Sequence, residues 1–184
     1  MSKKPYELGI LVGRFQTLHA GHVMMIRKAL ELCNEVGLFI GSSQESMTEK
    51  NPFDYETRKK MLEKVFGKKL KIYPLIDIHI GNFSGWGEYV LGNVVEKFGR
   101  SPDLLISGKE ERRISWFDGV SGLRISELYI PKLIDISASE MREFLLQDDE
   151  ASWKKYSPEP LWNMYEDLRS IVLQSADHHE TESV

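Results

Sequence analysis

The chain has 184 residues, the size of one compact domain. Hydrophobic residues make up 41% and charged residues 28% of it, which excludes a disordered chain. Uninterrupted apolar runs, such as Ile10–Val12, end after a few residues and are too short to span a membrane. The net charge of −4 gives no global attraction to nucleic acid or anionic lipid, and the single cysteine, Cys33, excludes an internal disulfide or a cysteine-rich zinc module.

The hydrophobic pattern predicts strands and helices in alternation. The expected strands cover residues 7–13, 36–41, 70–75, 103–106 and 124–129. A first helix is predicted between the first two strands from apolar residues at helical spacing, namely Val23, Ile26, Leu30 and Cys33. Further helices are expected over residues 55–66, 86–98 and 160–173, with a short one after Ser139. This alternation is typical of a parallel sheet covered on both faces, so we predict an α/β, Rossmann-like, doubly wound fold.

The segment between the first strand and the first helix carries the strongest functional signal. Ligands of doubly wound sheets bind beyond the carboxyl ends of the strands. Gly13 and Gly21 allow the backbone to approach a ligand closely, and Arg14 adds a positive charge. His19 and His22 are three residues apart, so both imidazoles can project from one face near the start of the helix, where anions bind. The pair could also be ordinary helix surface or a metal site, but a metal would need further ligands, and we expect none from the protein.

At this point the sequence resembles a known family. Gly13-Arg14-Phe15-Gln16 followed by His19-Ala20-Gly21-His22 is similar to the signature of nicotinamide mononucleotide (NMN) adenylyltransferases, in particular the archaeal-type and bifunctional bacterial ones, within the H-x-G-H nucleotidyltransferase superfamily. Thr17 stands where that family usually has proline. The resemblance implies a nucleotidyltransferase of the α/β phosphodiesterase type.

Segments after the second and third strands continue the resemblance. Gly41–Thr48, Asn51-Pro-Phe53 and Glu56-Thr-Arg58 match family segments in order. Arg58 would place a cation in the first turns of a helix, where the helix dipole disfavours it, and this suggests that it faces a ligand. Further along, Asp77–Gly87 resembles a segment in which, by analogy, Trp86 stacks on the nicotinamide ring, although a core anchor is the alternative.

Two later segments complete the comparison. Gly108, at a strand end, would admit the adenosine moiety, and cations of the 109–118 segment could reach a triphosphate, although no role is assigned to Trp116-Phe117-Asp118. Ser137 and Glu140 predict a capping box, and the same helix start could serve as a second phosphate cradle with Ser139 and Arg142. The resemblance spans Ile10 to Phe144. We therefore expect a catalytic domain over residues 1–150, a C-terminal helical extension of the same domain over 151–175 and a flexible tail over 176–184.

The resemblance implies transfer of the AMP moiety of ATP to the 5′-phosphate of NMN, which gives NAD and pyrophosphate. The expected catalytic residues are His19, His22 and Arg142. The expected ATP-binding residues are Gly13, Arg14, Phe15, His19, Gly21, His22, Gly108, Ser137, Ser139 and Arg142. The expected NMN-binding residues are Gln16, Ser42, Asn51, Arg58, Asn82 and Trp86. Magnesium is expected to bind through the ATP phosphates and water.

Other functions stay open at this point. Nicotinate mononucleotide or phosphopantetheine could be the acceptor, and CTP could be the donor. A nucleotide-sensing module without turnover is a second class, although both histidines and Arg142 are retained. A class I aminoacyl-tRNA synthetase is disfavoured by the short, acidic chain. With no export signal visible, we expect a cytoplasmic protein that binds small molecules, neither nucleic acid nor membrane, and that forms homo-oligomers as its relatives often do.

Overall fold

The computed structural model describes residues 3–78, 83–109 and 112–181. Its centre is a five-stranded parallel sheet in the order β3-β2-β1-β4-β5. The strands are β1 (Tyr6–Gly13), β2 (Cys33–Ile40), β3 (Lys71–Pro74), β4 (Leu104–Lys109) and β5 (Ser126–Pro131). Strands β2 and β3 are added on one side of β1, and β4 and β5 are added on the other side, so the strand order reverses between β1 and β4. Doubly wound folds bind ligands at this point. The predicted fold class is confirmed.

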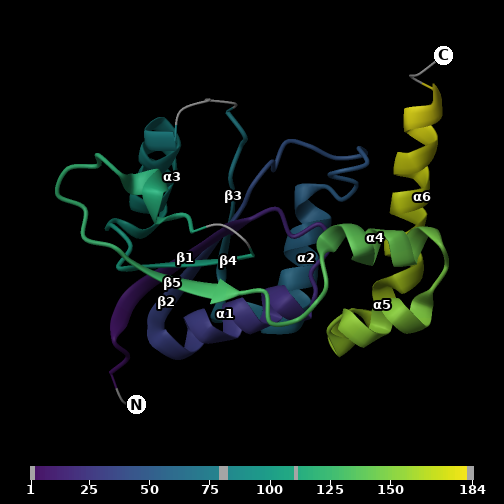
Figure 1. Ribbon diagram of the computed structural model, residues 1–184, viewed down its shortest axis with the longest axis horizontal. Coiled ribbons are helices and arrows are strands. Elements are labelled where there is room, and N and C mark those ends of the chain that lie inside the picture. Colours follow the sequence, from purple (N-terminus) through teal and green to yellow (C-terminus); the bar gives the residue numbers. More distant parts are fainter. Residues whose placement is uncertain (1–2, 79–82, 110–111, 182–184) are drawn as a thin grey trace.

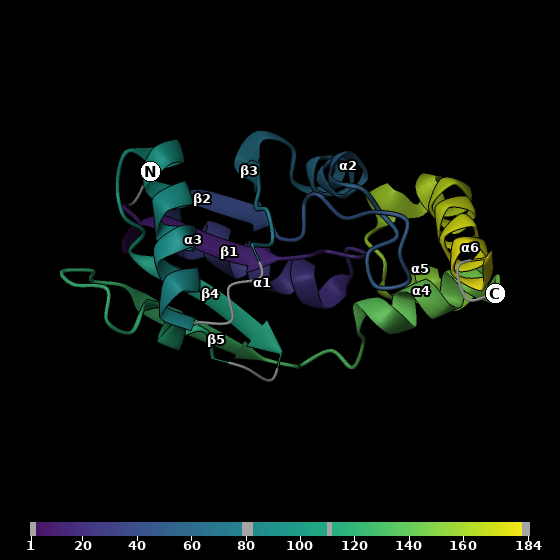
Figure 2. The ribbon, with the colours of Figure 1, turned by 90° about the horizontal axis from the view of Figure 1, so that it is seen from above.

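Helices cover both faces of the sheet (Figures 1 and 2). Residues of α1 and α2 share one apolar cluster, and those of α3 and η2 share a second cluster on the other face. The α-helices are α1 (Ala20–Leu32), α2 (Tyr55–Phe66), α3 (Phe83–Phe98), α4 (Ala138–Leu146), α5 (Glu150–Tyr156) and α6 (Tyr165–Thr181). The 3₁₀ helices are η1 (Gly67–Lys69), η2 (Ile114–Phe117) and η3 (Glu159–Met164).

The last three α-helices lie beyond the carboxyl ends of the strands, as Figure 2 shows. Their apolar residues belong to the same cluster as those of α1 and α2, and Trp153 of α5 is completely buried against Tyr165, with ring centroids 5.3 Å apart. The predicted extension over residues 151–175 therefore shares its core with the sheet. None of the helices in the described ranges is long and apolar enough to span a membrane.

Several predicted boundaries differ from the structure by a few residues, and helix α5 was not predicted; two of the differences have a clear physical reason. Cys33 was expected on the first helix, but that helix ends at Leu32 and Cys33 begins β2, where its buried side chain faces the same apolar cluster. Helix α6 continues to Thr181, past the predicted end at Leu173, so most of the polar segment expected as a tail is helical. Apolar periodicity stops at Val172, whereas residues such as Ala176 still favour a helix.

Candidate active site

A cavity of about 610 Å³ opens at the carboxyl edge of β1, β4 and β5, at the switch point of the sheet. It lies between the start of α1, the start of α4 and the loops after β1 and β2. Its lining includes all of the predicted ATP-binding residues, namely Gly13, Arg14, Phe15, His19, Gly21, His22, Gly108, Ser137, Ser139 and Arg142, as well as Gln16, Ser42 and Trp86 of the predicted NMN-binding residues.

The start of α1 brings the two histidines together. His19 is the N-cap residue, with extended backbone, and His22 follows in the first turn. Their rings stack with centroids 3.8 Å apart and planes inclined by 30°, and Phe15 packs against His22 at 5.0 Å. The first turn of α1 contains no acidic side chain, and the leading N–H groups of a helix lack intrahelical acceptors. This helix start can therefore bind an anion.

A second helix start faces the same cavity. The Ser137 hydroxyl accepts a hydrogen bond from the Glu140 backbone N–H at 3.2 Å, so the serine half of the predicted capping box is present. The same hydroxyl donates to the Glu140 carboxylate at 2.6 Å, which replaces the bond from that carboxylate to the Ser137 backbone N–H expected of a capping box. Arg142, one turn later, donates to the Ser139 hydroxyl at 3.2 Å and to the Gln16 carbonyl at 2.5 Å. These bonds fix the guanidinium against the loop after β1.

The arginines give the cavity a positive character. Burial lowers the pKa of Arg142, and the nearby charge of Arg14 lowers it further because two cations repel each other, whereas Glu49 raises it. Arg14 is itself exposed and donates to the Asn51 side-chain oxygen at 3.4 Å. A bound anion would relieve this repulsion, because it would stabilise both charges.

Gly108 lines the cavity as predicted, and the absence of a side chain there also serves the packing of the wall. A Cβ at this position would lie 2.7 Å from Sδ of Met25 and 3.1 Å from the Ile130 carbonyl oxygen. A larger residue here would force the Met25 side chain to move and would crowd the backbone of β5, so glycine favours the close packing of β4 against α1 and β5.

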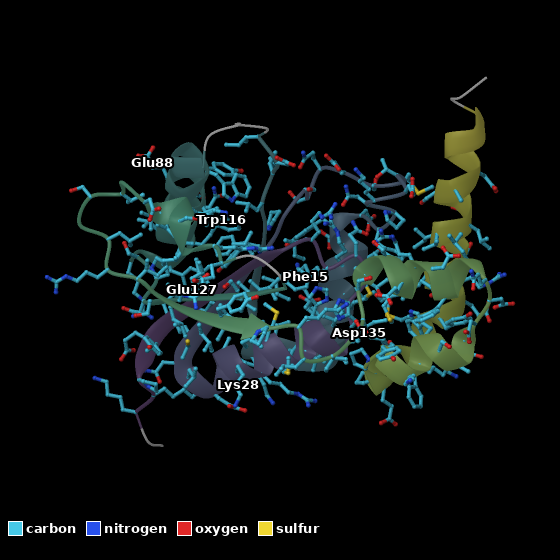
Figure 3. The ribbon with its side chains drawn as sticks, viewed as in Figure 1. Phe15, Lys28, Glu88, Trp116, Glu127 and Asp135 are labelled. Carbon is cyan, nitrogen blue, oxygen red and sulfur yellow. The ribbon has the colours of Figure 1, made fainter. Side chains whose placement is uncertain are left out.

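Aromatic rings form the wall on the α3 side. Trp86 meets Trp116 edge-to-face with centroids 6.0 Å apart, and Figure 3 shows Trp116 beside α3. Arg113 lies over the Trp116 ring at 5.1 Å and donates to the Val12 carbonyl at 2.6 Å. Both Arg113 and Trp116 line the cavity; Arg113 is one of the cations expected to reach a triphosphate, whereas no role was predicted for Trp116. The aromatic pair Trp116-Phe117 shortly after a charged run was the signal that could have indicated it.

Not every predicted acceptor residue faces the cavity with a free side chain. The Gln16 side chain is 2% exposed and pairs with the backbone of Phe53, donating to its carbonyl at 2.8 Å and accepting from its N–H at 3.0 Å. Asn51 and Arg58 do not line the cavity, and both are buried, Asn51 within the loop after β2 and Arg58 near the start of α2. Asn82 lies outside the described residues.

The arrangement of charges and helix starts around the cavity defines the class of protein. Cations and two helix starts at the switch point of a parallel sheet form a site for a phosphate-bearing nucleotide. The chain belongs to the cytidylyltransferase-like family, whose model matches residues 10–111.

Individual relatives carry names that state a particular activity. The chain is 28% identical to the nicotinamide-nucleotide adenylyltransferase of Thermococcus sibiricus over 89% of this chain and 85% of the relative. It is 41% identical to the protein of that name from Pyrococcus abyssi over 49% of this chain and 50% of the relative. The family resemblance predicted from the motifs is thus confirmed by the names of these relatives.

Solved structures share the fold. A bifunctional NMN adenylyltransferase/ADP ribose pyrophosphatase from Francisella tularensis matches with a TM-score of 0.72 and 21% identity, over 97% of this chain and 55% of that one. A structure of such a Francisella enzyme with AMP and a manganese ion matches with a TM-score of 0.68 and 22% identity, over 90% of this chain and 52% of that one. This chain therefore spans about half the length of those bifunctional proteins.

Proposed function

We propose that this protein is a nicotinamide-nucleotide adenylyltransferase, which transfers the AMP moiety of ATP to the 5′-phosphate of NMN. The observation that carries the proposal is the convergence of two helix starts, the stacked histidines and two arginines on one cavity at the switch point of the sheet. The acceptor is suggested by the names of the relatives that align with most of the chain.

The reaction balances without a protein nucleophile. An oxygen of the NMN 5′-phosphate forms a bond to the α-phosphorus of ATP, and the bond from that phosphorus to the α,β-bridging oxygen breaks, so that pyrophosphate leaves with the electron pair. The acceptor phosphate is already ionised at neutral pH, so no general base is required. Catalysis of this kind depends on positioning and on neutralising charge.

The residues around the cavity divide these tasks. His22 and Arg142, on the two helix starts, stabilise the charge that grows on the transferred and leaving phosphates. His19, stacked against His22, holds the ATP phosphates. Arg14, in the loop after β1, adds positive charge to the cavity lining.

The aromatic wall suits the acceptor base. Trp86 is half-buried, and its ring is held edge-to-face by Trp116. A flat, positively charged nicotinamide ring would stack on the face of Trp86, where cation–π attraction contributes. Stacking there would aim the 5′-phosphate toward the helix starts.

Magnesium enters this proposal as the partner of ATP. The described residues contain no group of three His, Cys, Asp or Glu side chains that could hold a metal ion, and the cavity is rich in cations. A magnesium ion would fit here on phosphate oxygens and water, as it prefers. When bound, it would neutralise phosphate charge.

A second acceptor is favoured by one observation. Arg113 lines the cavity beside Trp116. A guanidinium near the pyridine ring of the acceptor would favour the carboxylate of nicotinate mononucleotide over the amide of NMN. The test is therefore formation of pyrophosphate and dinucleotide from ATP and magnesium with each mononucleotide in turn. Product with NMN supports the proposal, the ratio of kcat/KM values decides the acceptor, and binding of ATP without product from either would overturn the proposal in favour of another acceptor or a sensor.

The same assay tests the role of His22. We expect His22→Ala to lower kcat by about 100-fold or more, because it removes a group that acts on the developing charge, while the KM for NMN changes little. The exposed Lys28→Ala on the same helix is the control. An unchanged kcat would remove His22 from the mechanism.

A further inference from the structure

Arg58 is a buried cation in an unfavourable place. It stands in the first turn of α2, where the helix dipole opposes a positive charge, and its exposed fraction is 0%. Burial lowers the pKa of its guanidinium to about 10, so the group is still charged at neutral pH. A buried charge is costly unless it is well hydrogen-bonded, so its presence calls for a specific role.

All four of the hydrogen bonds described for the Arg58 guanidinium end on backbone carbonyls. Nε donates to Asp54 at 3.1 Å, Nη1 to Gly41 at 2.8 Å and to Arg14 at 3.2 Å, and Nη2 to Ser42 at 3.1 Å. These carbonyls belong to the loop after β1, the loop after β2 and the N-cap of α2. One guanidinium therefore joins the start of its own helix to both ends of the loop after β2 and to the loop after β1, which is 44 residues away in the sequence.

The two loops are held where their backbone is strained. Phe15, next to Arg14, has φ 53°, and Ser42 has φ 47°, both in the left-handed region that non-glycine residues avoid. Such conformations persist only when the surrounding structure fixes them. The carbonyls that Arg58 binds lie at Ser42 itself and directly before Phe15, so the guanidinium is placed to fix both.

The same loops carry groups of the cavity lining, namely Arg14, Phe15 and Ser42. We propose that Arg58 is a positioning residue, whose buried guanidinium holds the loops after β1 and β2 in the conformation that binds both phosphate-bearing substrates. This proposal rests on the proposed function for its kinetic readout. It differs from the expectation that Arg58 contacts the acceptor, since Arg58 lies below the cavity lining.

Substitution of Arg58 tests the proposal. Lys keeps the charge but cannot reproduce the planar fork of donors, and Gln removes the charge. We expect Arg58→Lys and Arg58→Gln to raise the KM values for both ATP and the acceptor by about tenfold and to lower kcat/KM by about 100-fold, because small displacements of site groups are costly. Lys60→Gln is the matched control, since it removes one positive charge from the exposed face of the same helix.

Two readouts separate positioning from a general loss of stability. Destabilisation alone would reduce the amount of folded enzyme and lower the apparent kcat at unchanged KM. Hydrogen exchange needs no turnover, and we expect faster amide exchange in residues 41–54 of Arg58→Lys than of Lys60→Gln, with the sheet unchanged. KM values and loop exchange equal to those of the control would overturn the proposal, whereas absence of activity in the unsubstituted protein would overturn only the proposed function. If Arg58→Gln does not fold, Arg58→Lys decides.

Discussion

Trp86 is the residue at which acceptor binding can be tested apart from ATP binding. Trp86 lines the cavity from α3, whereas Arg142 lines it from α4. Stacking on an aromatic ring contributes about 1–3 kcal/mol, so we expect Trp86→Ala to raise the KM for NMN by about 10- to 100-fold, with little change in the KM for ATP. Steady-state kinetics with each substrate varied would measure this. Trp162→Ala, at a 40% exposed tryptophan of η3, is the control, and equal effects on both KM values would contradict the stacking role.

At the residue scale, the sequence predicts which residue types gather but not where each side chain points. His19, His22, Ser139 and Arg142 line the cavity as expected, because helix starts after strands have fixed positions in this fold. Gln16 lies in the same motif, yet its amide is bonded to the backbone of Phe53. A motif contains supporting residues as well as contact residues, and only three-dimensional packing separates them.

At the scale of elements, helix α6 contacts the loop after β2. The hydrophobic periodicity of the sequence does not predict this contact. The Ser175 hydroxyl lies 3.8 Å from Sδ of Met47, and Ser175 is only 1% exposed although it stands near the end of the helix. Met47 belongs to the loop that carries Ser42 to the cavity. Sequence periodicity predicts helices one at a time, so it found the helix but placed its end at Leu173, before this contact.

A charge at this contact should therefore affect the loop. We expect Ser175→Glu to raise the KM for the acceptor by about tenfold, because a buried carboxylate there would push the loop away from the helix. The matched control is Ser170→Glu, which adds the same charge to an exposed position of α6. Kinetics at a temperature well below the unfolding midpoint of both variants would compare them. Equal KM values in the two variants would show that α6 does not support the loop.

For the molecule as a whole, one apolar cluster extends from the sheet through α1 and α2 to the C-terminal helices. Trp153 belongs to this cluster, with no exposed surface. A division of the chain at residue 150 would cut through the cluster. The alternation of strands and helices predicted the sheet, but nothing local in the sequence shows that the C-terminal helices close the same core.

This shared core predicts a single unfolding transition. Trp153→Ala should lower the free energy of unfolding by about 3–5 kcal/mol, which is the usual cost of removing a large buried aromatic side chain, while the transition stays cooperative. Trp162→Ala, at the exposed tryptophan, should cost much less. Urea unfolding followed by circular dichroism and by fluorescence would measure both. The contrary result would be two separate transitions, of which Trp153→Ala shifts only the one at lower urea concentration. That result would show that the C-terminal helices fold as an independent unit on a sheet that is stable without them.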